Sequence, residues 1–257
     1  MEVHHHPHVE KKSFREYFLE FLMIFLAVTL GFFAETIREN IAEHRKAKEF
    51  AESMLNDLKE DSVQLRSYNE YFEFAANNID TLQQLLSAAD TKAIVTGKLY
   101  WYGLFGGAYG HFVPNDETFQ QMKSSGSLRY FEKEASSAAS KYDRFCRLMQ
   151  SNEQTQESIY TEVRKLRAQI FDFRYNDIAN TIAQQYYKDH SDYGRIDSFL
   201  KTRPPLLSYD KTLFNEYIEL VRSRFIRVYN VGAADSLMHQ ASVLMQTLKT
   251  EYHLKGE

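Results

Sequence analysis

Near its amino terminus the chain reads Tyr17-Phe18-Leu19-Glu20-Phe21-Leu22-Met23-Ile24-Phe25-Leu26-Ala27-Val28-Thr29-Leu30-Gly31-Phe32-Phe33-Ala34. Its last part, residues 21–34, carries no charge, whereas the whole chain has a mean hydropathy of -0.49. A transmembrane helix needs about 20 mostly apolar residues, so a full span must also take in Glu20 and Glu35. We assign residues 14–37 to a single transmembrane anchor for a large hydrophilic body.

Two other interpretations of this stretch are open. Lys11, Lys12 and Arg15 before an apolar run also describe a secretory signal peptide. Glu20 interrupts that run, however, and the sequence around Ala34 has a bulky Phe where a cleavage site requires a small residue. A buried core helix is the second alternative, because short apolar runs are often core helices. The uncleaved span is the interpretation that we favour.

The orientation of the anchor depends on its flanking charges. Three basic residues precede it, and Arg38, Arg45, Lys46 and Lys48 follow it, so the positive-inside count is nearly even. The short amino-terminal tail is typical of an uncleaved signal anchor. We therefore expect an inner-membrane protein with a cytoplasmic tail and a periplasmic body.

One face of the expected span carries small residues. At 3.6 residues per turn, Glu20, Ala27, Gly31 and Ala34 fall within about 60° of one another. Ala27 and Gly31 form a small-xxx-small pair, which allows two helices to approach closely in lipid. The face predicts a homo-oligomer or a membrane protein partner; alternatively, Glu20 lies among the lipid headgroups and the spacing is coincidental.

The composition favours helices and limits the possible partners. Only 4 prolines and 10 glycines occur among 257 residues, which predicts an all-α fold. A net charge of -4 without a basic stripe gives no indication of nucleic acid. His4, His5, His6 and His8 lie in residues 1–13, which we interpret as a flexible tail, and we expect no metal or other cofactor. Cys146 is the single cysteine, so no intramolecular disulfide forms.

The body, residues 38–257, shows helical periodicity from its start. A first stripe predicts that the anchor continues as a stalk to about Leu65, and a second predicts a helix over residues 68–86, before a break at Asp90-Thr91. Residues 94–115 hold five of the glycines and the only tryptophan. This segment reads as a connection with a short helix, which either lines a binding pocket or folds over the bundle core.

The next segment, residues 115–128, reads as a short helix with Asn115 as its N-cap and Gly126 as a left-handed stop, after which Ser127 caps the following helix. A three-four repeat then extends to Phe173, and Asn152 and Gln156 interrupt it. The helix either continues through Asn152 or restarts there at a capping box. Residues 189–209 read as a connection. A last long helix then follows, with the stripe Phe214, Ile218, Val221, Phe225, Val228, Val231, Ala234, Met238, Ala241, Met245, Leu248 and Tyr252. These elements predict an antiparallel long-helix bundle.

Two pieces of the chain, together about 35 residues, carry a resemblance. They are the anchor with its flanks, from Phe18 to Asn40, and the element Thr118-Phe119-Gln120-Gln121-Met122-Lys123-Ser124-Ser125-Gly126-Ser127-Leu128. Both resemble a family of bacterial single-pass inner-membrane proteins that contain a domain of unknown function. Met122 stands where that family usually has leucine, and Tyr130 adds an aromatic residue after the element. The resemblance implies a helical body at the inner membrane, and no reaction or cofactor.

Three classes of function remain open at this point. We expect a membrane-anchored interaction or scaffold module without enzymatic activity. The alternative is an extracytoplasmic ligand sensor that signals through a partner. A hydrolase using Asp116 and Glu117 is a weaker alternative, because carboxylates at a helix start already have a structural explanation.

Overall fold

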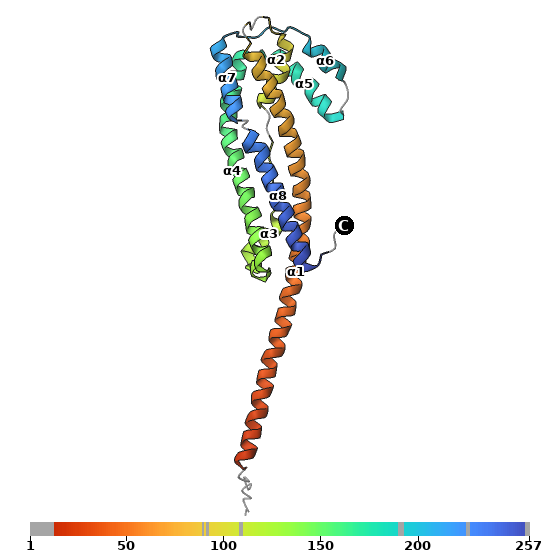
Figure 1. Cartoon of the computed structure of the whole chain (residues 1–257), viewed down its shortest axis with the longest axis vertical. Helices are drawn as coiled ribbons and strands as arrows, with labels where there is room; N and C mark the ends of the chain where they lie inside the picture. Colours follow the sequence, from red (N-terminus) through yellow and green to blue (C-terminus); the bar gives the residue numbers. More distant parts are fainter. Residues whose placement is uncertain are drawn as a thin grey trace, which may run out of the picture. The chain divides into compact units, whose positions relative to one another are not determined.

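The computed structural model describes residues 13–88, 90, 93–107, 110–189, 193–224 and 227–254. Over these residues the chain is all-α without strands, which confirms the predicted fold class (Figure 1). The α-helices are α1 (Phe14–Leu86), α2 (Thr96–Gly103), α3 (Glu117–Ser125), α4 (Lys133–Ile170), α5 (Phe173–Asp189), α6 (Tyr193–Leu200), α7 (Lys211–Arg224) and α8 (Arg227–Tyr252). Two 3-10 helices, η1 (Phe105–Gly107) and η2 (Ser127–Tyr130), complete the set.

The chain divides into two compact units, residues 1–50 and residues 51–257, and the division falls within α1. In the first unit, α1 begins at Phe14, and the carboxylate of Glu16 accepts the backbone N–H of Ser13 at 2.8 Å. This is one of the two bonds of a capping box, the S-x-x-E signature of a helix start. The histidines of the predicted tail lie outside the described residues.

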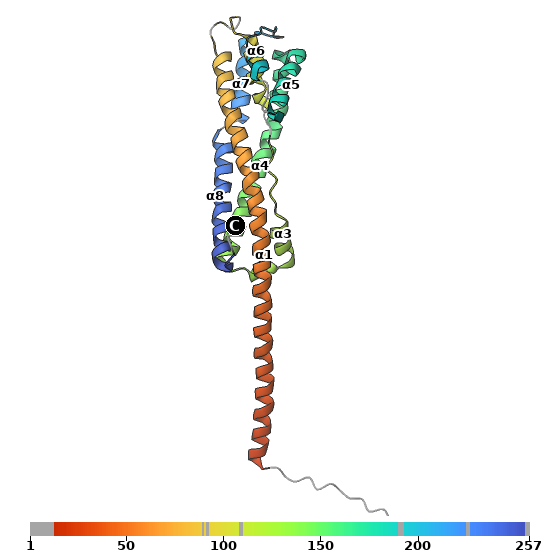
Figure 2. The ribbon, with the colours of Figure 1, turned by 90° about the vertical axis from the view of Figure 1, so that its right-hand side faces the viewer.

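The second unit is organised around α1, α4 and α8. Asp61 of α1 meets Tyr142 of α4, and Tyr68 meets Glu153 further along both helices, so α1 and α4 run in the same direction. Asn69 of α1 donates to Asp235 of α8, and Asp80 pairs with Arg222 of α7, so α7 and α8 run antiparallel to α1. Figure 2 shows α2, α5, α6 and α7 at one end of this unit and α3 at the other.

The parallel course of α1 and α4 requires a return segment, which residues 110–116 provide without helix or strand. Phe112 of this segment is buried between the helices. Gly110 approaches α1 so closely that a Cβ atom there would lie 2.9 Å from the Phe72 ring. The segment therefore carries buried backbone groups that no regular element can pair.

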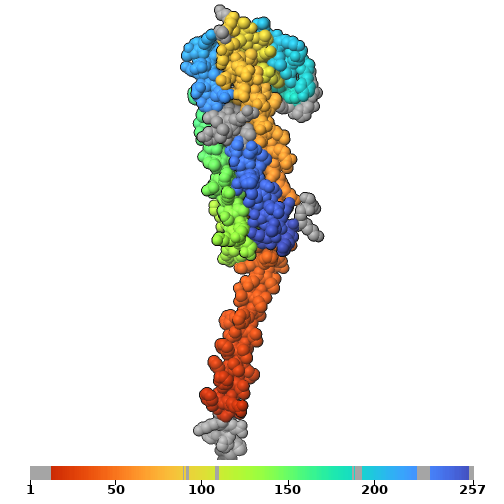
Figure 3. Space-filling model, in the orientation of Figure 1, coloured from red at the N-terminus to blue at the C-terminus, as the bar shows by residue number. Residues whose placement is uncertain are grey.

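The helix α8 packs against α4 and α1, and the space-filling view shows it lying between them (Figure 3). The side of α8 that faces the bundle core consists mostly of alanine and leucine side chains. The buried residues of α8 are Ala234, Leu237, Ala241, Leu244, Leu248 and Tyr252. Val63, Phe74 and other scattered apolar side chains of this unit remain exposed, as is normal for soluble domains.

The predicted last long helix corresponds to α7 and α8, which lie on either side of residues 225–226, outside the described residues. In α8 the predicted stripe is correct at Ala234, Ala241, Leu248 and Tyr252, which are buried. It is wrong at Met238 and Met245, which are only half-buried, because Leu237 and Leu244 take the buried positions. The side chains of Phe225, Val228 and Val231 lie outside the described residues.

The helix α4 is continuous through Asn152, so the first of the two alternatives holds and no capping box restarts the helix. Glu153, and not Asn152, occupies the buried position after Met149. The helix ends at Ile170 and α5 begins at Phe173, which is 76% exposed, so the predicted seam stops before that residue.

The element bounds decide three further expectations: they correct the first and the third and confirm the second. The predicted stalk and the helix over residues 68–86 are parts of one helix, α1, which ends at Leu86, ahead of the expected break. The segment 94–115 contains α2 and η1, as a connection with short helical turns requires. The predicted connection at residues 189–209 contains the additional helix α6, which buries Phe199.

Candidate functional site

The apolar part of α1 in the first unit is a candidate membrane-contacting surface. Among the described residues, α1 is the one helix long and apolar enough to cross a membrane. Its most apolar window of 18 residues has a mean hydropathy of 2.1, and none of it is buried. A soluble domain rarely exposes a continuous apolar patch of this kind, which makes this surface a candidate for contact with a membrane.

The predicted packing residues lie on this part of α1. Ala27, Gly31 and Ala34 are exposed, and Glu20 is half-buried. A Cβ atom added to Gly31 would meet nothing within 4 Å, so this face has open space beside it. Helical periodicity places the four residues on one side of the helix, and the structure of a single chain leaves their predicted packing role as a prediction.

The second predicted element, residues 118–128, forms α3 and the stop behind it. Thr118, Phe119 and Met122 are buried, whereas Ser124 and Ser125 are exposed and Leu128 is half-buried. Gly126 has a φ of 72°, which confirms the predicted left-handed stop. The motif therefore attaches α3 to the bundle through its threonine, aromatic and methionine side chains.

Two capping predictions around α3 are wrong, those at Asn115 and at Ser127. Asp116, and not Asn115, occupies the N-cap position, because Asn115 turns toward α1. The backbone N–H of Asn115 donates to Asp61 at 2.8 Å, and its side-chain amide donates to Glu60 at 3.0 Å. At the other end Ser127 begins η2, and its own N–H donates to the hydroxyl of Ser125 at 3.4 Å.

Asp61 is the centre of a buried polar cluster that joins three parts of the bundle. Its side chain is completely buried, and it accepts the N–H of Asn115 at 2.8 Å and the hydroxyl of Tyr142 at 2.6 Å. Burial, the main cause, raises the pKa of Asp61, and these two hydrogen bonds oppose the rise. The carboxylate therefore connects α1, the return segment and α4.

Glu153, further along α4, is a second buried carboxylate that accepts a backbone N–H of the return segment. It is 6% exposed and accepts the backbone N–H of Phe112 at 3.0 Å, and its other oxygen lies 3.3 Å from Nδ1 of His111. Burial raises the pKa of Glu153, and the bond from Phe112 opposes this. Two buried carboxylates thus satisfy two backbone N–H groups of a segment that has no ladder of its own.

A cavity of about 350 Å³ lies beneath α3, next to the Asp61 cluster. Leu58, Phe119 and Tyr142 supply apolar walls, and Asp57 and Asp116 supply carboxylates. Cys146 also lines it, and burial raises the pKa of this thiol to about 12, so it stays protonated near neutrality. A protonated thiol is a poor nucleophile, and no described group of three or more His, Cys, Asp or Glu residues has the geometry to hold a metal ion.

Asp116 and Glu117, the two carboxylates considered for hydrolysis, have contacts that are typical of a helix start. Asp116 accepts the side-chain amide of Gln120 at 2.9 Å, and Glu117 is an exposed residue in the first turn of α3. Negative charge is favourable at this helix end. Their positions are accounted for by α3 itself.

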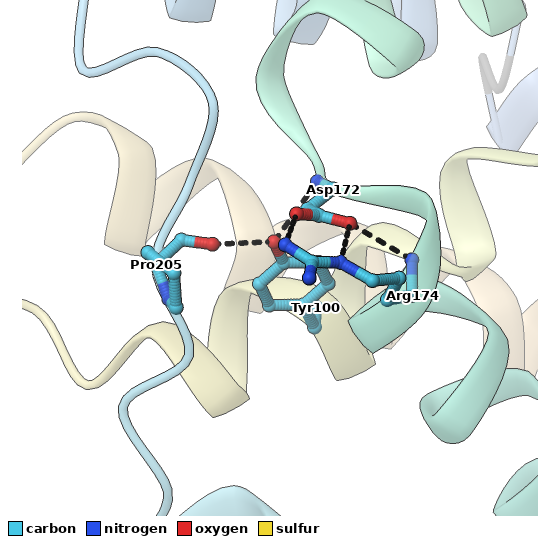
Figure 4. Close-up of polar contacts among 4 residues, drawn as sticks. All are labelled: Tyr100, Asp172, Arg174 and Pro205. Atoms are coloured by element: carbon cyan, nitrogen blue, oxygen red, sulfur yellow. Dashed lines mark hydrogen bonds and ion pairs between the residues drawn. The ribbon is translucent and has the colours of Figure 1, made fainter.

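A second polar junction joins α2 to the break between α4 and α5. The hydroxyl of Tyr100 donates to the carbonyl of Pro205 at 2.7 Å and accepts the backbone N–H of Asp172 at 3.0 Å (Figure 4). Asp172 in turn forms an ion pair with Arg174 at 2.7 Å. Burial raises the pKa of Tyr100 to about 12, so the hydroxyl keeps the proton that it donates.

Beside this junction lies a cavity of about 560 Å³. Leu104 and Gly107, from the glycine- and aromatic-rich segment, line it together with Arg164 and Arg167 of α4. Most aromatic side chains of the same segment, among them Trp101 and Phe105, are buried in the bundle. The segment therefore covers the core and also contributes part of a cavity wall.

The sequence analysis missed the buried charged residues. Asp61 and Glu153 both stand at positions of an apolar stripe. Asp61 lies three residues after Leu58 and four before Leu65, and Glu153 lies four residues after Met149. A charged residue in the phase of an apolar stripe was the available signal. Arg224, which is 2% exposed and donates to the carbonyl of Gly106 at 3.0 Å, had a comparable position at the end of α7.

Comparison with known proteins adds no relative. No family model, no curated protein and no solved structure matches this chain. The resemblance carried by residues 18–40 and 118–128 therefore stays a prediction.

Proposed function

We propose that this protein is a membrane-anchored helical interaction module whose apolar segment of α1 spans a bacterial inner membrane. The observation that carries the proposal is the apolar window of mean hydropathy 2.1, none of which is buried. Exposed apolar surface costs about 25 cal/mol per Å² in water, and a bilayer removes that cost. The proposal assigns binding, and no reaction, to the body.

A pair of matched variants of the full chain tests the anchor. A lysine at the centre of a membrane helix opposes insertion by about 2.5–3.5 kcal/mol. Leu26→Lys should therefore shift protein from the membrane pellet to the soluble or aggregated fraction. Leu148→Lys makes the same change at an exposed leucine of α4 and should leave the protein in the pellet. Release of the wild-type protein from the membrane pellet by a carbonate wash would contradict a spanning helix.

The proposed orientation places the amino-terminal tail in the cytoplasm and the body in the periplasm. Its support is the short basic tail before the apolar segment. Protease added to intact spheroplasts should then digest the body, and a tag at the amino terminus should survive until the membrane is opened. Survival of the body and loss of the tag would reverse the orientation.

The partner that we propose is a second copy of the chain or another membrane protein, docked on the face of Ala27 and Gly31. Its support is the open space around Gly31, where a neighbouring backbone can approach. Gly31→Leu should reduce cross-linked dimers in membranes. Thr29→Leu, which enlarges a residue on the opposite side of the helix, should not. Equal cross-linking in both variants would place the interface elsewhere.

A further inference from the structure

The cavity at the junction of α4 and α5 is lined by positive side chains. Arg164 and Arg167 line it together with the amides of Asn176 and Asn180, and none of its described lining residues carries a carboxylate. The chain as a whole has a net charge of -4. Two guanidinium groups at one cavity are therefore a local excess of positive charge in an acidic protein.

Arg167 lacks an anionic partner among the described residues. One of its terminal nitrogens donates to the side-chain oxygen of Asn176, which is neutral. Its Nε is buried and has no hydrogen-bond acceptor in the described part of the chain. A buried donor without an acceptor is costly, and the planar fork of arginine matches the oxygens of a carboxylate or phosphate.

Tyr160 gives the cavity a flat aromatic wall beside these charges. The guanidinium carbon of Arg164 lies 5.6 Å from the centre of the Tyr160 ring, and that of the buried Arg224 lies 4.8 Å from it. Phe171 and Phe173 add further aromatic surface. When the anionic group of a ligand reaches the arginines, the rest of that ligand lies within reach of these aromatic rings.

Another part of the cavity wall is held by the junction of Figure 4. Phe171 and Leu207 both line the cavity. The neighbouring Asp172 and Pro205 are joined through the Tyr100 hydroxyl, and the N–H of Leu207 donates to the carbonyl of Ile170 at 2.9 Å. The two chain segments that carry Phe171 and Leu207 are therefore held in place before a ligand binds, which lowers the entropic cost of binding.

We propose that this cavity binds a small organic oxyanion, in which a carboxylate or phosphate group is attached to a flat apolar part. The volume of about 560 Å³ lies within the range of ligand pockets. Arg164 and Arg167 bind the oxyanion, and Tyr160 and Phe171 contact the apolar part. The site lies within the second unit and does not depend on the proposed membrane anchor.

Isothermal titration of the full chain in mild detergent tests the site with three probes: phenyl phosphate, benzoate and phenol. The phosphate and carboxylate probes differ in the anionic group, and phenol keeps the ring without the charge. We expect saturable binding of at least one oxyanion, about tenfold or more tighter than phenol and weakened by added salt. Tighter binding of phenyl phosphate or of benzoate identifies the preferred anion. Equal affinity for phenol, or no saturable binding of either oxyanion, overturns the proposal.

A matched pair of arginine variants locates the site. Arg164→Gln removes one guanidinium at the cavity, and Arg144→Gln removes another exposed guanidinium of α4, which also lies 5.6 Å from a neighbouring ring centre. The first should weaken oxyanion binding about tenfold or more, and the second should leave it unchanged. Arg167→Lys, which keeps the charge but loses the fork, should weaken binding as well. Equal affinities in the Arg164 and Arg144 variants overturn the assignment.

Discussion

The hydroxyl of Tyr142 donates a 2.6 Å hydrogen bond to the fully buried carboxylate of Asp61. This bond joins α1 to α4 at the level where α3 begins. The other oxygen of Asp61 accepts the backbone N–H of Asn115, so one side chain fixes two helices and the return segment between them. Burying a carboxylate is costly unless it is hydrogen-bonded, and here both oxygens are engaged.

Asp61→Ala should destabilise the body far more than Asp61→Asn. The alanine variant leaves two buried donors without an acceptor, at about 1–3 kcal/mol each. Asparagine still accepts the N–H of Asn115, and its amide can donate to the Tyr142 oxygen, so a loss below about 1 kcal/mol is expected. Denaturant unfolding of the full chain, followed by fluorescence of the buried Trp101, measures both.

The control for this comparison is Asp177→Ala, which removes an exposed carboxylate from α5. It should change the free energy of unfolding by less than about 0.5 kcal/mol. Similar losses in the alanine and asparagine variants of Asp61 would show that the hydrogen bonds of this carboxylate do not hold the bundle.

The same pair predicts a pH dependence of stability. Burial raises the pKa of Asp61 in the folded state, so above an ordinary carboxyl pKa of about 3.9 the folded state binds more protons than the unfolded state. The contribution of Asp61 to stability is therefore greatest below that pH and decreases as the pH rises through the raised pKa. Wild type minus Asp61→Asn, measured by unfolding at several pH values, isolates this contribution. A difference that grows with pH would refute the direction of the shift.

The stop behind α3 predicts an asymmetry between two glycines. Gly126 has a φ of 72°, where a side chain costs about 1–2 kcal/mol, so Gly126→Ala should lower the free energy of unfolding by about that amount. Gly194 lies in α6 at an ordinary helical φ with open space around it. Gly194→Ala should be neutral or stabilising by up to about 1 kcal/mol. Equal effects of the two substitutions would argue against a left-handed Gly126.

The helical fold could be predicted from the sequence because its signals are local. The apolar segment of residues 21–34, the stripe through Leu58 and Leu65 and the stop at Gly126 all arise from neighbouring residues along one helix. Their presence required no knowledge of the partner elements. The same holds for α4, whose repeat predicted Tyr142, Met149 and Val163 as buried, as the structure confirms.

The buried polar positions could not be predicted in this way, because their partners lie far away in sequence. Asp61 meets Asn115 and Tyr142, and Glu153 meets Phe112. Residues 110–116 have no helical or strand period, so nothing in them indicates which acceptors they require. The junction between Tyr100 and Pro205 is equally non-local. Tertiary hydrogen bonds of irregular backbone leave no periodic trace in sequence.

Cys146 should report opening of the cavity beneath α3. It is 4% exposed, and burial raises the pKa of its thiol to about 12, so few thiolates are available to an alkylating reagent near neutral pH. We expect negligible modification of the native protein at that pH and complete modification in denaturant, measured by mass spectrometry. A cysteine introduced at the exposed Ser140 of α4 should react rapidly in the native state. Equal rates at both positions would mean that the cavity is open to solvent.

Tyr100→Phe should loosen the junction of α2, α4 and α5 without removing any apolar packing. The substitution deletes one hydroxyl and so leaves the N–H of Asp172 and the carbonyl of Pro205 without their shared partner, at a cost of about 1–3 kcal/mol. The bond from the Leu207 N–H to the Ile170 carbonyl lies next to these groups. Hydrogen exchange at Leu207 should therefore accelerate together with the loss of stability.

Tyr193→Phe provides the comparison, because Tyr193 is exposed and its hydroxyl pairs with that of Tyr186 at 2.8 Å. Water can replace that bond, so the change in unfolding free energy should stay within about 0.5 kcal/mol. If the Leu207 amide exchanges its hydrogen at the wild-type rate in both tyrosine variants, the Tyr100 hydroxyl does not fix the cavity wall. If only Tyr100→Phe accelerates exchange, the wall depends on that hydroxyl, and oxyanion binding should weaken in the same variant because part of its preorganisation is lost.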